Sequence, residues 1–341
     1  MVKKHIVVVG AGLSGLITAN KLAENNSYRV TVLEKGVLNS PINDDRYYSG
    51  QSPNLNFTRA QGVGGTSNYW HSGLIKMPRS SSWAYNMLYT SGWYTQAMNL
   101  VDCQFPQAAK RDIQHNKFDR IYYPFKRYRA IPNQSVCVIS SVMGIKIDTH
   151  NSNIGFSISG TGHCLDFDIL ILAAGGIGTP LLLQEEFHRE QFQHTPIGAN
   201  LTDHISSNPM KIKLKKLSLM RFSSFFYKGI IRKGHIYKDP KAGLNHIIYL
   251  RPAMNLSLGS HTQALKRLLI GFWATPNKIQ SLLELASSVD MLLEIIANKL
   301  PIPLLTRYLS VSIVSEQESK NSNFVSCDGK KKNIVWSFSD T

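Results

Sequence analysis

The distribution of apolar and polar positions predicts a βαβ unit at the start of the chain. Residues 6–9 form a short, continuously apolar run, which is typical of a strand buried in a parallel sheet. A helical pattern with Ala19 and Leu22 on its inner face follows, and a second apolar run at residues 30–33 ends at Glu34. Strand, helix and strand in this order are the repeating unit of a parallel sheet.

The turn between the first strand and the helix is rich in glycine. Gly10 allows a tight turn, Gly12 lets the backbone approach a pyrophosphate, and Gly15 lets helix and strand pack closely. Glu34 lies nineteen residues after Gly15, where its carboxylate can accept hydrogen bonds from a ribose. The alternative is a glycine-rich turn in another α/β protein, but the complete context favours a dinucleotide site.

Later apolar runs predict that the chain leaves this nucleotide fold and returns to it. Residues 135–148 and 153–167 read as strands of a meander. Residues 168–172 form a fully apolar strand that ends in small residues, a second close-approach point for a cofactor. The next helix is predicted to begin at Thr179 and Pro180, because proline suits the first turn of a helix.

The remaining pattern predicts a second domain with an antiparallel sheet and helices. Its predicted strands are 206–217, 244–250, 308–315, 324–327 and 333–338, and its helical stretches are 80–102, 261–272 and 278–299. The predicted boundaries are 1–76 with 131–205 for the nucleotide-binding domain, and 77–130 with 206–341 for the substrate domain.

A second glycine-rich loop follows a polar, turn-rich stretch. Gly62, Gly64 and Gly65 precede the hydroxyl residues Thr66 and Ser67. Such a loop can lie flat against a ligand and point its N–H groups at it. A tight turn before a helix is the alternative interpretation.

Composition changes this picture only in part. The chain has 341 residues, 43% of them hydrophobic, and a formal net charge of +16. That charge suggests a nucleic acid or an anionic surface as partner, but no stacking aromatics are interleaved with the densest lysines. Residues 210–215 alternate between apolar and lysine, which predicts a half-buried strand with a cationic outer face. We therefore expect no nucleic-acid partner, while an anionic substrate or peripheral contact with a membrane stays open.

Cysteine usage and hydropathy favour a cytoplasmic protein. Cys103, Cys137, Cys164 and Cys327 lack metal-ligand spacing, so we expect no metal site and reduced, mostly buried thiols. The N-terminus imitates a signal peptide, but cleavage would cut the nucleotide motif. Residues 282–300 come closest to a membrane span, but charged residues interrupt them, and an amphipathic helix is the better interpretation.

Four motifs in one order resemble the glucose-methanol-choline (GMC) family of FAD-dependent oxidoreductases. They are residues 10–15 with Glu34, 64–67 (GGTS), 173–180 (AAGGIGTP) and 198–204 (GANLTDH). The resemblance spans most of the chain. It implies a Rossmann-like FAD-binding domain interleaved with a substrate domain.

The resemblance also implies bound FAD and oxidation of an alcohol or sugar CH–OH group by hydride transfer to flavin N5. The glycines of the first turn would face the diphosphate, Glu34 the adenosine ribose, and residues 64–67 the flavin. The residues that it assigns to FAD are Gly10, Gly12, Leu13, Ser14, Gly15, Glu34, Lys35, Gly64, Gly65, Thr66, Ser67, Asn68, Ala174 and Gly175. The electron acceptor is not identified.

Two departures from the family pattern carry their own expectations. Relatives with covalent flavin attach it through a histidine at the position that matches Tyr69, and His71 lies two residues further on, so we expect non-covalent FAD. The sequence stops at Thr341, just where the family's final segment with its catalytic histidine should begin. No histidine here lies in a matching motif, and His204 and His246 are weak candidates, so the sequence identifies no catalytic base.

Three hypotheses therefore stay open. The first is an FAD-dependent alcohol or sugar oxidoreductase. The second is a truncated, catalytically inactive flavin-binding protein. The third is a cationic surface-binding protein that has kept an FAD fold.

Overall fold

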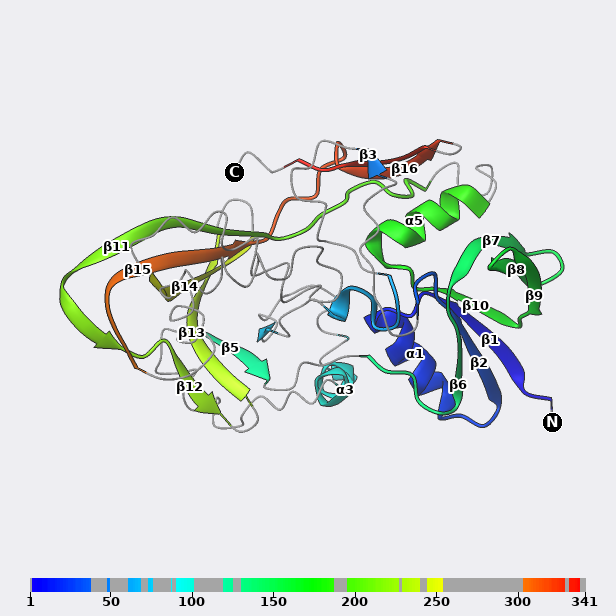
Figure 1. Ribbon diagram of the computed structural model, residues 1–341, viewed down its shortest axis with the longest axis horizontal. Coiled ribbons are helices and arrows are strands. Elements are labelled where there is room, and N and C mark those ends of the chain that lie inside the picture. Colours follow the sequence, from blue (N-terminus) through cyan, green and yellow to red (C-terminus); the bar gives the residue numbers. More distant parts are fainter. Residues whose placement is uncertain are drawn as a thin grey trace. The chain divides into compact units, whose positions relative to one another are not determined.

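In the computed structural model, the chain forms two compact units (Figure 1). Unit 1 comprises Met1–Trp70, Arg129–Asp203 and Gln317–Thr341, and unit 2 comprises His71–Tyr128 and His204–Glu316. The residues that the structure describes are 2–37, 48–49, 61–68, 73–75, 87, 90–100, 119–124, 130–186, 195–226, 229–239, 244–253, 303–328 and 331–337.

A four-stranded parallel sheet forms the centre of unit 1. Its strands, in spatial order, are β10 (Ile169–Leu172), β1 (Lys4–Val9), β2 (Tyr28–Leu33) and β6 (Val136–Ile139). Helix α1 (Leu13–Ala23) connects β1 to β2 and buries Leu16 and Ala19. The predicted βαβ unit is confirmed, because the continuous apolar runs are the strands that the sheet buries.

A small antiparallel sheet completes the core of unit 1. It consists of β7 (Val142–Asp148), β8 (Asn153–Ile158) and β9 (Thr161–Asp166), as the meander pattern predicted. Ile154 and Phe156 of β8 pack into one apolar cluster with Val7, Val9 and Leu33 of the parallel sheet. Burial of these side chains fixes the meander against the parallel sheet.

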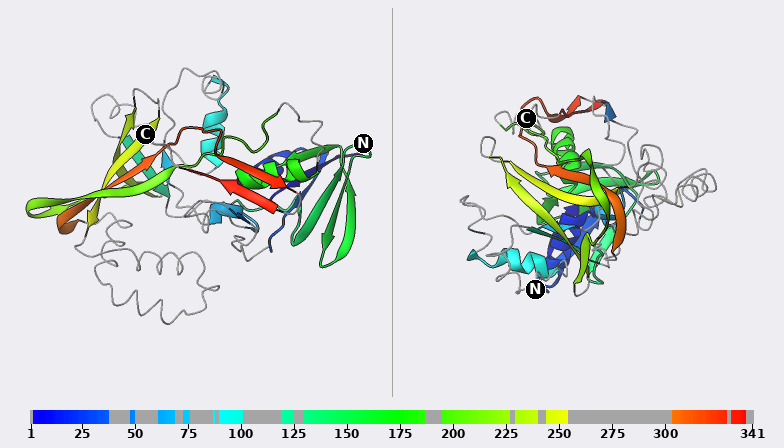
Figure 2. Two further views of the ribbon diagram at one scale, coloured as in Figure 1. Left: turned by 90° about the horizontal axis from the view of Figure 1, so that it is seen from above. Right: turned by 90° about the vertical axis from the view of Figure 1, so that its left-hand side faces the viewer.

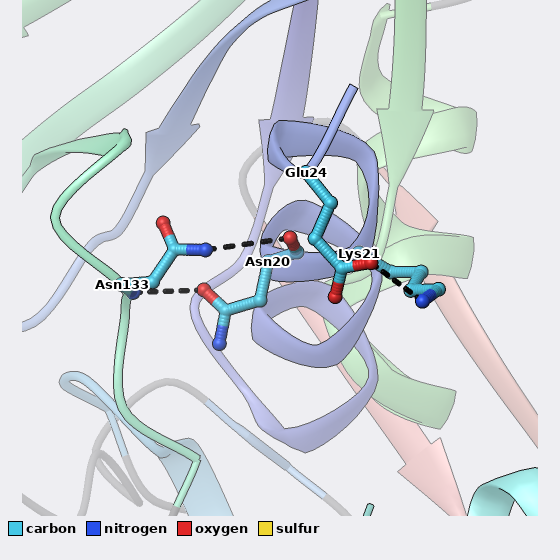
Figure 3. A network of polar contacts seen from close by, with 4 residues as sticks. All are labelled: Asn20, Lys21, Glu24 and Asn133. Atoms are coloured by element: carbon cyan, nitrogen blue, oxygen red, sulfur yellow. Dashed lines mark hydrogen bonds and ion pairs between the residues drawn. The ribbon is translucent and has the colours of Figure 1, made fainter. Parts of the chain in front are cut away.

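Asn20 of α1 fixes the segment that leads into β6 (Figure 3). The Asn133 N–H donates to Asn20 Oδ1 at 2.9 Å, and Asn133 Nδ2 donates to the Asn20 carbonyl at 3.4 Å. Asn20 Nδ2 in turn donates to the Ile131 carbonyl at 2.8 Å. Lys21 and Glu24 form an exposed ion pair on the same helix. The bonds of Asn20 satisfy backbone groups that no sheet partner reaches.

Helix α5 (Gly175–Glu186) follows β10 and begins four residues before the predicted start. The prediction of a start at Thr179 is therefore wrong, and Pro180 lies inside the helix. Pro180 has no N–H to donate to the carbonyl of Gly176, one turn earlier. Because Gly176 is exposed, water can satisfy that carbonyl.

The C-terminal strands belong to unit 1. β16 (Phe324–Asp328) pairs with β17 (Lys331–Val335), which pairs with β3 (Tyr48–Ser49). Gln184 of α5 donates to the carbonyl of Val325 at 3.1 Å and accepts a hydrogen bond from the N–H of Cys327 at 2.7 Å. The assignment of residues 206–341 to the substrate domain is thus wrong for residues 317–341, because this sheet packs on α5.

Unit 2 contains an antiparallel sheet of seven described strands. In spatial order they are β11 (Ile205–Met220), β15 (Leu304–Ser315), β14 (Asn245–Ala253), β13 (Gly229–Lys238), β5 (Asp119–Pro124) and β4 (Leu74–Ile75), and β12 (Ser223–Phe226) also pairs with β13. Figure 2 shows β11 and β15 running side by side as a long, curved pair. The predicted strands β11, β14 and β15 are confirmed, whereas β5, β12 and β13 were not predicted.

Strand β11 differs from the half-buried strand that the sequence predicted. Met210 and Ile212 on one face are 56% and 39% exposed, and Lys211 and Lys213 on the other are also exposed. Among the described strands, β11 lies at one edge of the sheet, where it pairs with β15. The alternating pattern therefore predicted the strand correctly but its burial wrongly.

The expectations for the cysteines and for the predicted helices have different outcomes. Cys137 and Cys164 are exposed and only Cys327 is buried among the described cysteines, so the expectation of mostly buried thiols is wrong for the first two. Helix α3 (Trp93–Leu100) confirms part of the helical stretch predicted at residues 80–102. The helices predicted at 261–272 and 278–299, the amphipathic stretch at 282–300, and Cys103 lie outside the described residues. Within the described ranges, no helix has the length and apolar character needed to cross a bilayer.

Candidate functional site

The turn between β1 and α1 has the geometry of a phosphate-binding turn. Gly10 has φ 106°, and a Cβ atom there would lie 2.5 Å from the carbonyl oxygen of Ala173. A Cβ atom at Gly15 would lie 2.0 Å from the carbonyl oxygen of Gly10. Only glycine fits these two positions, so the helix can follow the strand this closely.

Gly12 differs from Gly10 and Gly15 because its side is open. A Cβ atom at Gly12 would have no heavy atom within 4 Å. Gly12 is the N-cap residue of α1, it offers no side-chain cap, and the first turn of the helix contains no acidic residue. The N–H groups of Leu13 and Ser14 therefore need a partner from outside the helix, and an anion suits both them and the helix dipole.

The second glycine-rich loop lies directly against this turn. The Gly64 N–H donates to the Ala11 carbonyl at 2.8 Å, and Gly12 and Gly64 form a parallel β-bridge. A Cβ atom at Gly65 would lie 3.0 Å from the Cα of Gly12. The two predicted loops are about 53 residues apart in the sequence, yet their backbone atoms are in contact. A ligand that binds to both loops would require this contact.

A short 3₁₀ turn, η2 (Gly65–Asn68), shapes the end of this loop. Asn68 Nδ2 donates to the carbonyls of Val63 and Gly65 at 2.9 Å and 3.0 Å. Ser67 is buried and donates to the Gly64 carbonyl, whereas Thr66 is exposed. Asn68 and Ser67 therefore hold the loop from inside.

Glu34 occupies the centre of the site. It is 7% exposed, and its Oε2 accepts a hydrogen bond from the Ala11 N–H at 2.8 Å. Its Oε1 accepts from the N–H groups of Gly36 at 2.8 Å and Gly62 at 2.9 Å. A carboxylate has about four lone-pair directions, so these three bonds leave one acceptor direction, on Oε2 beside the glycine turn.

The third predicted segment, at the end of β10, also reaches this point. The Ala173 N–H donates to the Val9 carbonyl at 2.8 Å, and Ala174 Cα would lie 3.0 Å from a Cβ atom at Gly10. Gly175 has φ 80°, is exposed, and has open space beside it. The segments from β1, β2 and β10 thus meet at the carboxyl ends of the parallel strands, where ligands of open α/β sheets bind.

The sequence analysis missed the contribution of three residues to the environment of Glu34. It also assigned to FAD one residue, Lys35, that lies at the edge of the site. Gly36 was assigned no role, and Gly62 was expected to point its N–H at a ligand, whereas that N–H donates to Glu34 and a Cβ atom at Gly36 would lie 2.1 Å from the nitrogen of Gly62. Ala11, which was also missed, supplies the amide that faces Glu34 Oε2. Lys35 is exposed in the turn after Glu34. The sequence did hold one signal, since a glycine two residues after a terminal acid can offer its N–H to that acid.

The remaining candidates do not join this cluster. His204 and His246 belong to unit 2, where His246 stacks on Tyr237 with ring centroids 6.0 Å apart. Tyr69 and His71, on which the expectation of non-covalent flavin rests, lie outside the described residues. In the part of the chain that is described, no group of three His, Cys, Asp or Glu side chains could hold a metal ion.

Comparisons with known proteins agree with this geometry. The family described as an NAD(P)-binding Rossmann-like domain matches residues 8–37, which contain the β1–α1 turn and Glu34. Among solved structures, pyridoxine 4-oxidase from Mesorbium loti matches with a TM-score of 0.56 and 12% identity, over 97% of this chain and 75% of that chain. The chain has the fold of this oxidase. The predicted fold class, a Rossmann-like α/β unit interleaved with an antiparallel sheet, is therefore confirmed.

Two more relatives complete the comparison. Formate oxidase of Aspergillus oryzae RIB40 matches with a TM-score of 0.47 and 13% identity, over 98% of this chain and 77% of that chain. YobN of Bacillus subtilis (strain 168), which is named as an L-amino-acid oxidase, is 46% identical over 54 residues. That match covers 14% of this chain and 11% of YobN, so the chain spans about a tenth of the curated relative that it matches.

Proposed function

We propose that this chain is an FAD-dependent oxidoreductase of the GMC family that oxidises a CH–OH group of an alcohol or sugar. The observation that carries the proposal is the backbone contact between Gly12 and Gly64, which joins the dinucleotide turn to the second glycine-rich loop. The order of the four motifs and the fold shared with pyridoxine 4-oxidase support it.

The residues of the site fit FAD. The open side of Gly12 and the N–H groups of Leu13 and Ser14 suit a diphosphate, because nothing else in the first turn of α1 satisfies them. The remaining acceptor direction of Glu34 Oε2 suits one ribose hydroxyl. Gly64 and Gly65 allow a flat ring system to approach the backbone, because neither carries a side chain.

Bound FAD would supply the hydride acceptor at flavin N5. The part of the chain described in unit 1 contributes binding and orientation: amides for the diphosphate, a carboxylate for the ribose, and a rigid glycine-rich wall. Tyr69 stands where covalent relatives carry a histidine, so the proposed attachment is non-covalent. The alcohol proton would go to a base that the sequence does not identify.

A pair of glycine substitutions tests the proposal. Gly12→Ala should leave the fold intact, because its methyl group meets nothing within 4 Å and its φ of −73° suits any residue. The methyl group would occupy the space at the helix N-terminus, so we expect FAD affinity to fall at least about tenfold, equivalent to ~1.4 kcal/mol. Gly162→Ala is the matched control, since a Cβ atom there also meets nothing within 4 Å.

The measurement is a titration with FAD that follows flavin fluorescence. Saturable binding that Gly12→Ala weakens and Gly162→Ala preserves would support the site. Absence of flavin from the purified protein together with no binding of added FAD would refute it. Bleaching of bound FAD by added alcohols then separates an enzyme from a catalytically inactive flavin-binding protein.

A further inference from the structure

One end of the β11–β15 strand pair extends past the rest of the described unit 2 sheet. β14 pairs with β15 only as far as Ala253, which is opposite Tyr308. Beyond Tyr308, residues 304–306 of β15 pair with residues 218–220 of β11. Among the described strands this end is therefore a two-stranded ribbon, and we call residues 215–221 and 304–307 the ribbon end.

The two faces of the ribbon end differ in exposure. Residues opposite each other on paired strands share a face, and so do residues two apart along one strand. Leu219 is opposite Leu305, and these side chains are 67% and 55% exposed. Leu217, on the same face as Leu219, is 56% exposed. The other face is partly or fully buried and consists of Ser218, Met220, Leu304 and Thr306.

This distribution is the reverse of what a solvated strand face shows. A face in water normally carries polar residues, whereas here the hydroxyl of Thr306 lies on the covered face and three leucines lie on the open one. Exposed apolar side chains that cluster in this way mark interaction sites. The outward face of the ribbon end is therefore a candidate contact surface.

Basic side chains flank the exposed leucines. Lys215, Lys216, Arg221 and Arg307 are all exposed, and Arg307 shares a face with Leu305. Strands β11 and β15 contain no acidic residue. The ribbon end thus combines apolar and positively charged side chains.

The acidic residues described in unit 2 lie away from the ribbon end. They are Asp119, Asp239 and Glu316. The strand registers place all three level with Ser312 of β15 or beyond it. Ser312 is five residues from Arg307 along the strand, or roughly 16 Å. The positive charge of the ribbon end therefore calls for an anionic partner.

We propose that the ribbon end binds the surface of an anionic lipid bilayer. The leucines enter the boundary between headgroups and acyl chains, and the basic side chains contact lipid phosphates. A nucleic acid fits less well, because residues 215–221 and 304–307 contain no aromatic side chain on which bases could stack. A protein partner also fits less well, because lysine is depleted and aromatic residues are enriched at protein interfaces. This surface goes beyond the proposed function and does not depend on FAD.

The test is flotation of the 341-residue chain with two kinds of vesicles. One kind contains phosphatidylcholine and phosphatidylglycerol in equal parts, and the other contains phosphatidylcholine alone. We expect binding to the mixed vesicles at low ionic strength and weaker binding as NaCl is added. Neutral vesicles should bind far less, because only a small apolar area enters the bilayer.

Two pairs of substitutions separate the leucines from the charges. Leu219→Thr with Leu305→Thr should lower binding to mixed vesicles at least about tenfold, because the contacts with acyl chains are lost. Lys216→Gln with Arg221→Gln should also lower binding at least about tenfold and weaken its salt dependence.

Each pair has a matched control in unit 1. Ile131→Thr with Met143→Thr replaces apolar residues that are 68% and 62% exposed. Lys3→Gln with Lys4→Gln removes two exposed positive charges. Both controls should bind mixed vesicles as wild type does.

Each outcome decides the proposal. Loss of binding in both ribbon-end pairs, with binding kept in both controls, supports it. No binding to mixed vesicles overturns it, and so does unchanged binding in either ribbon-end pair, because the net charge of the chain or its apolar surface elsewhere then explains the attraction. An equal loss in a control has the same meaning. Urea titrations show whether the leucine pair still folds, and if it does not, the lysine–arginine pair decides the outcome.

Discussion

Glu34 connects three segments of unit 1 through a single carboxylate. It accepts the N–H groups of Ala11, Gly36 and Gly62, which belong to the β1–α1 turn, the turn after β2 and the second glycine-rich loop. Hydrogen bonds to a buried charged group are worth more than neutral ones, about 1.5–3 kcal/mol each. Glu34 is therefore expected to assemble the site before any ligand binds.

Glu34→Gln tests this role in the absence of flavin. The amide replaces one acceptor oxygen by an NH₂ group, which then faces a backbone N–H. We expect the free energy of unfolding to fall by about 1–3 kcal/mol in urea titrations. Glu24→Gln is the control, because Glu24 is in an exposed ion pair with Lys21 and its loss should cost less than about 1 kcal/mol. Equal stabilities of wild type and Glu34→Gln would show that the three amides do not depend on the charge.

At the scale of single residues, the sequence predicted that Glu34 belongs to the site, but it predicted only some of the residues that contact Glu34. The spacing from Gly15 predicts an acid at the tip of β2, since strand and helix lengths fix that distance. The bond to Gly62 is different, because it joins residues 28 apart through a stretch with no periodic pattern. Local rules carry no information about such a contact, and only the close approach of Gly36 to Gly62 reveals it.

At the scale of elements, His5 joins the strands of unit 1 at the end of the sheet opposite the glycine turns. It is 5% exposed, its Nε2 lies 2.8 Å from Thr31 Oγ1 of β2, and its Nδ1 lies 2.5 Å from the Asp166 carbonyl. Its backbone N–H donates to Asp168 Oδ2 at 2.6 Å, and Arg29 contacts the ring. Burial, and secondly the Arg29 charge, lower the pKa of His5 below its usual 6.5, although the Asp166 carbonyl and the two aspartates oppose the shift.

This lowered pKa predicts a pH dependence of stability. The unfolded chain binds the proton first as pH falls below about 6.5, so the stability that neutral His5 contributes is full above that pH and is lost as pH falls toward its folded pKa. We expect a loss of at most about 1.4 kcal/mol per pH unit, absent in His5→Gln. Burial raises the pKa of Glu186, which contributes with the opposite sign, so the difference between wild type and His5→Gln is the relevant measurement. A slope shared by wild type and His5→Gln would contradict this account.

The sequence predicted elements where apolar periodicity is clean. β1, β2 and β10 are continuous apolar runs, and β11 alternates regularly. β13 escaped prediction, because Arg232 and Lys233 break its apolar run and Gly234 lowers its strand propensity. Its pairing with β5 and β14 on both sides overrides that local preference.

At the scale of the whole molecule, the chain crosses between two units, and the candidate site combines segments from several parts of unit 1. Return of the chain at β10 could be predicted, because a fully apolar strand followed by small residues is distinctive. The assignment of residues 317–341 to unit 1 could not be predicted, because apolar and polar residues alternate in β16 and β17 as they do in the strands of unit 2. What decides their place is Gln184, whose side chain bonds to the backbone of β16.

Amide hydrogen exchange of the 341-residue chain, with and without saturating FAD, tests the central claim most directly. The N–H groups of Leu13 and Ser14 lack helical partners, so FAD held by them should slow their exchange, together with that of residues 61–68, while the meander strand β9 stays unchanged. The account predicts added protection in peptides that cover residues 10–16 and 61–68. Protection confined to other parts of the chain, or none at all, would contradict it.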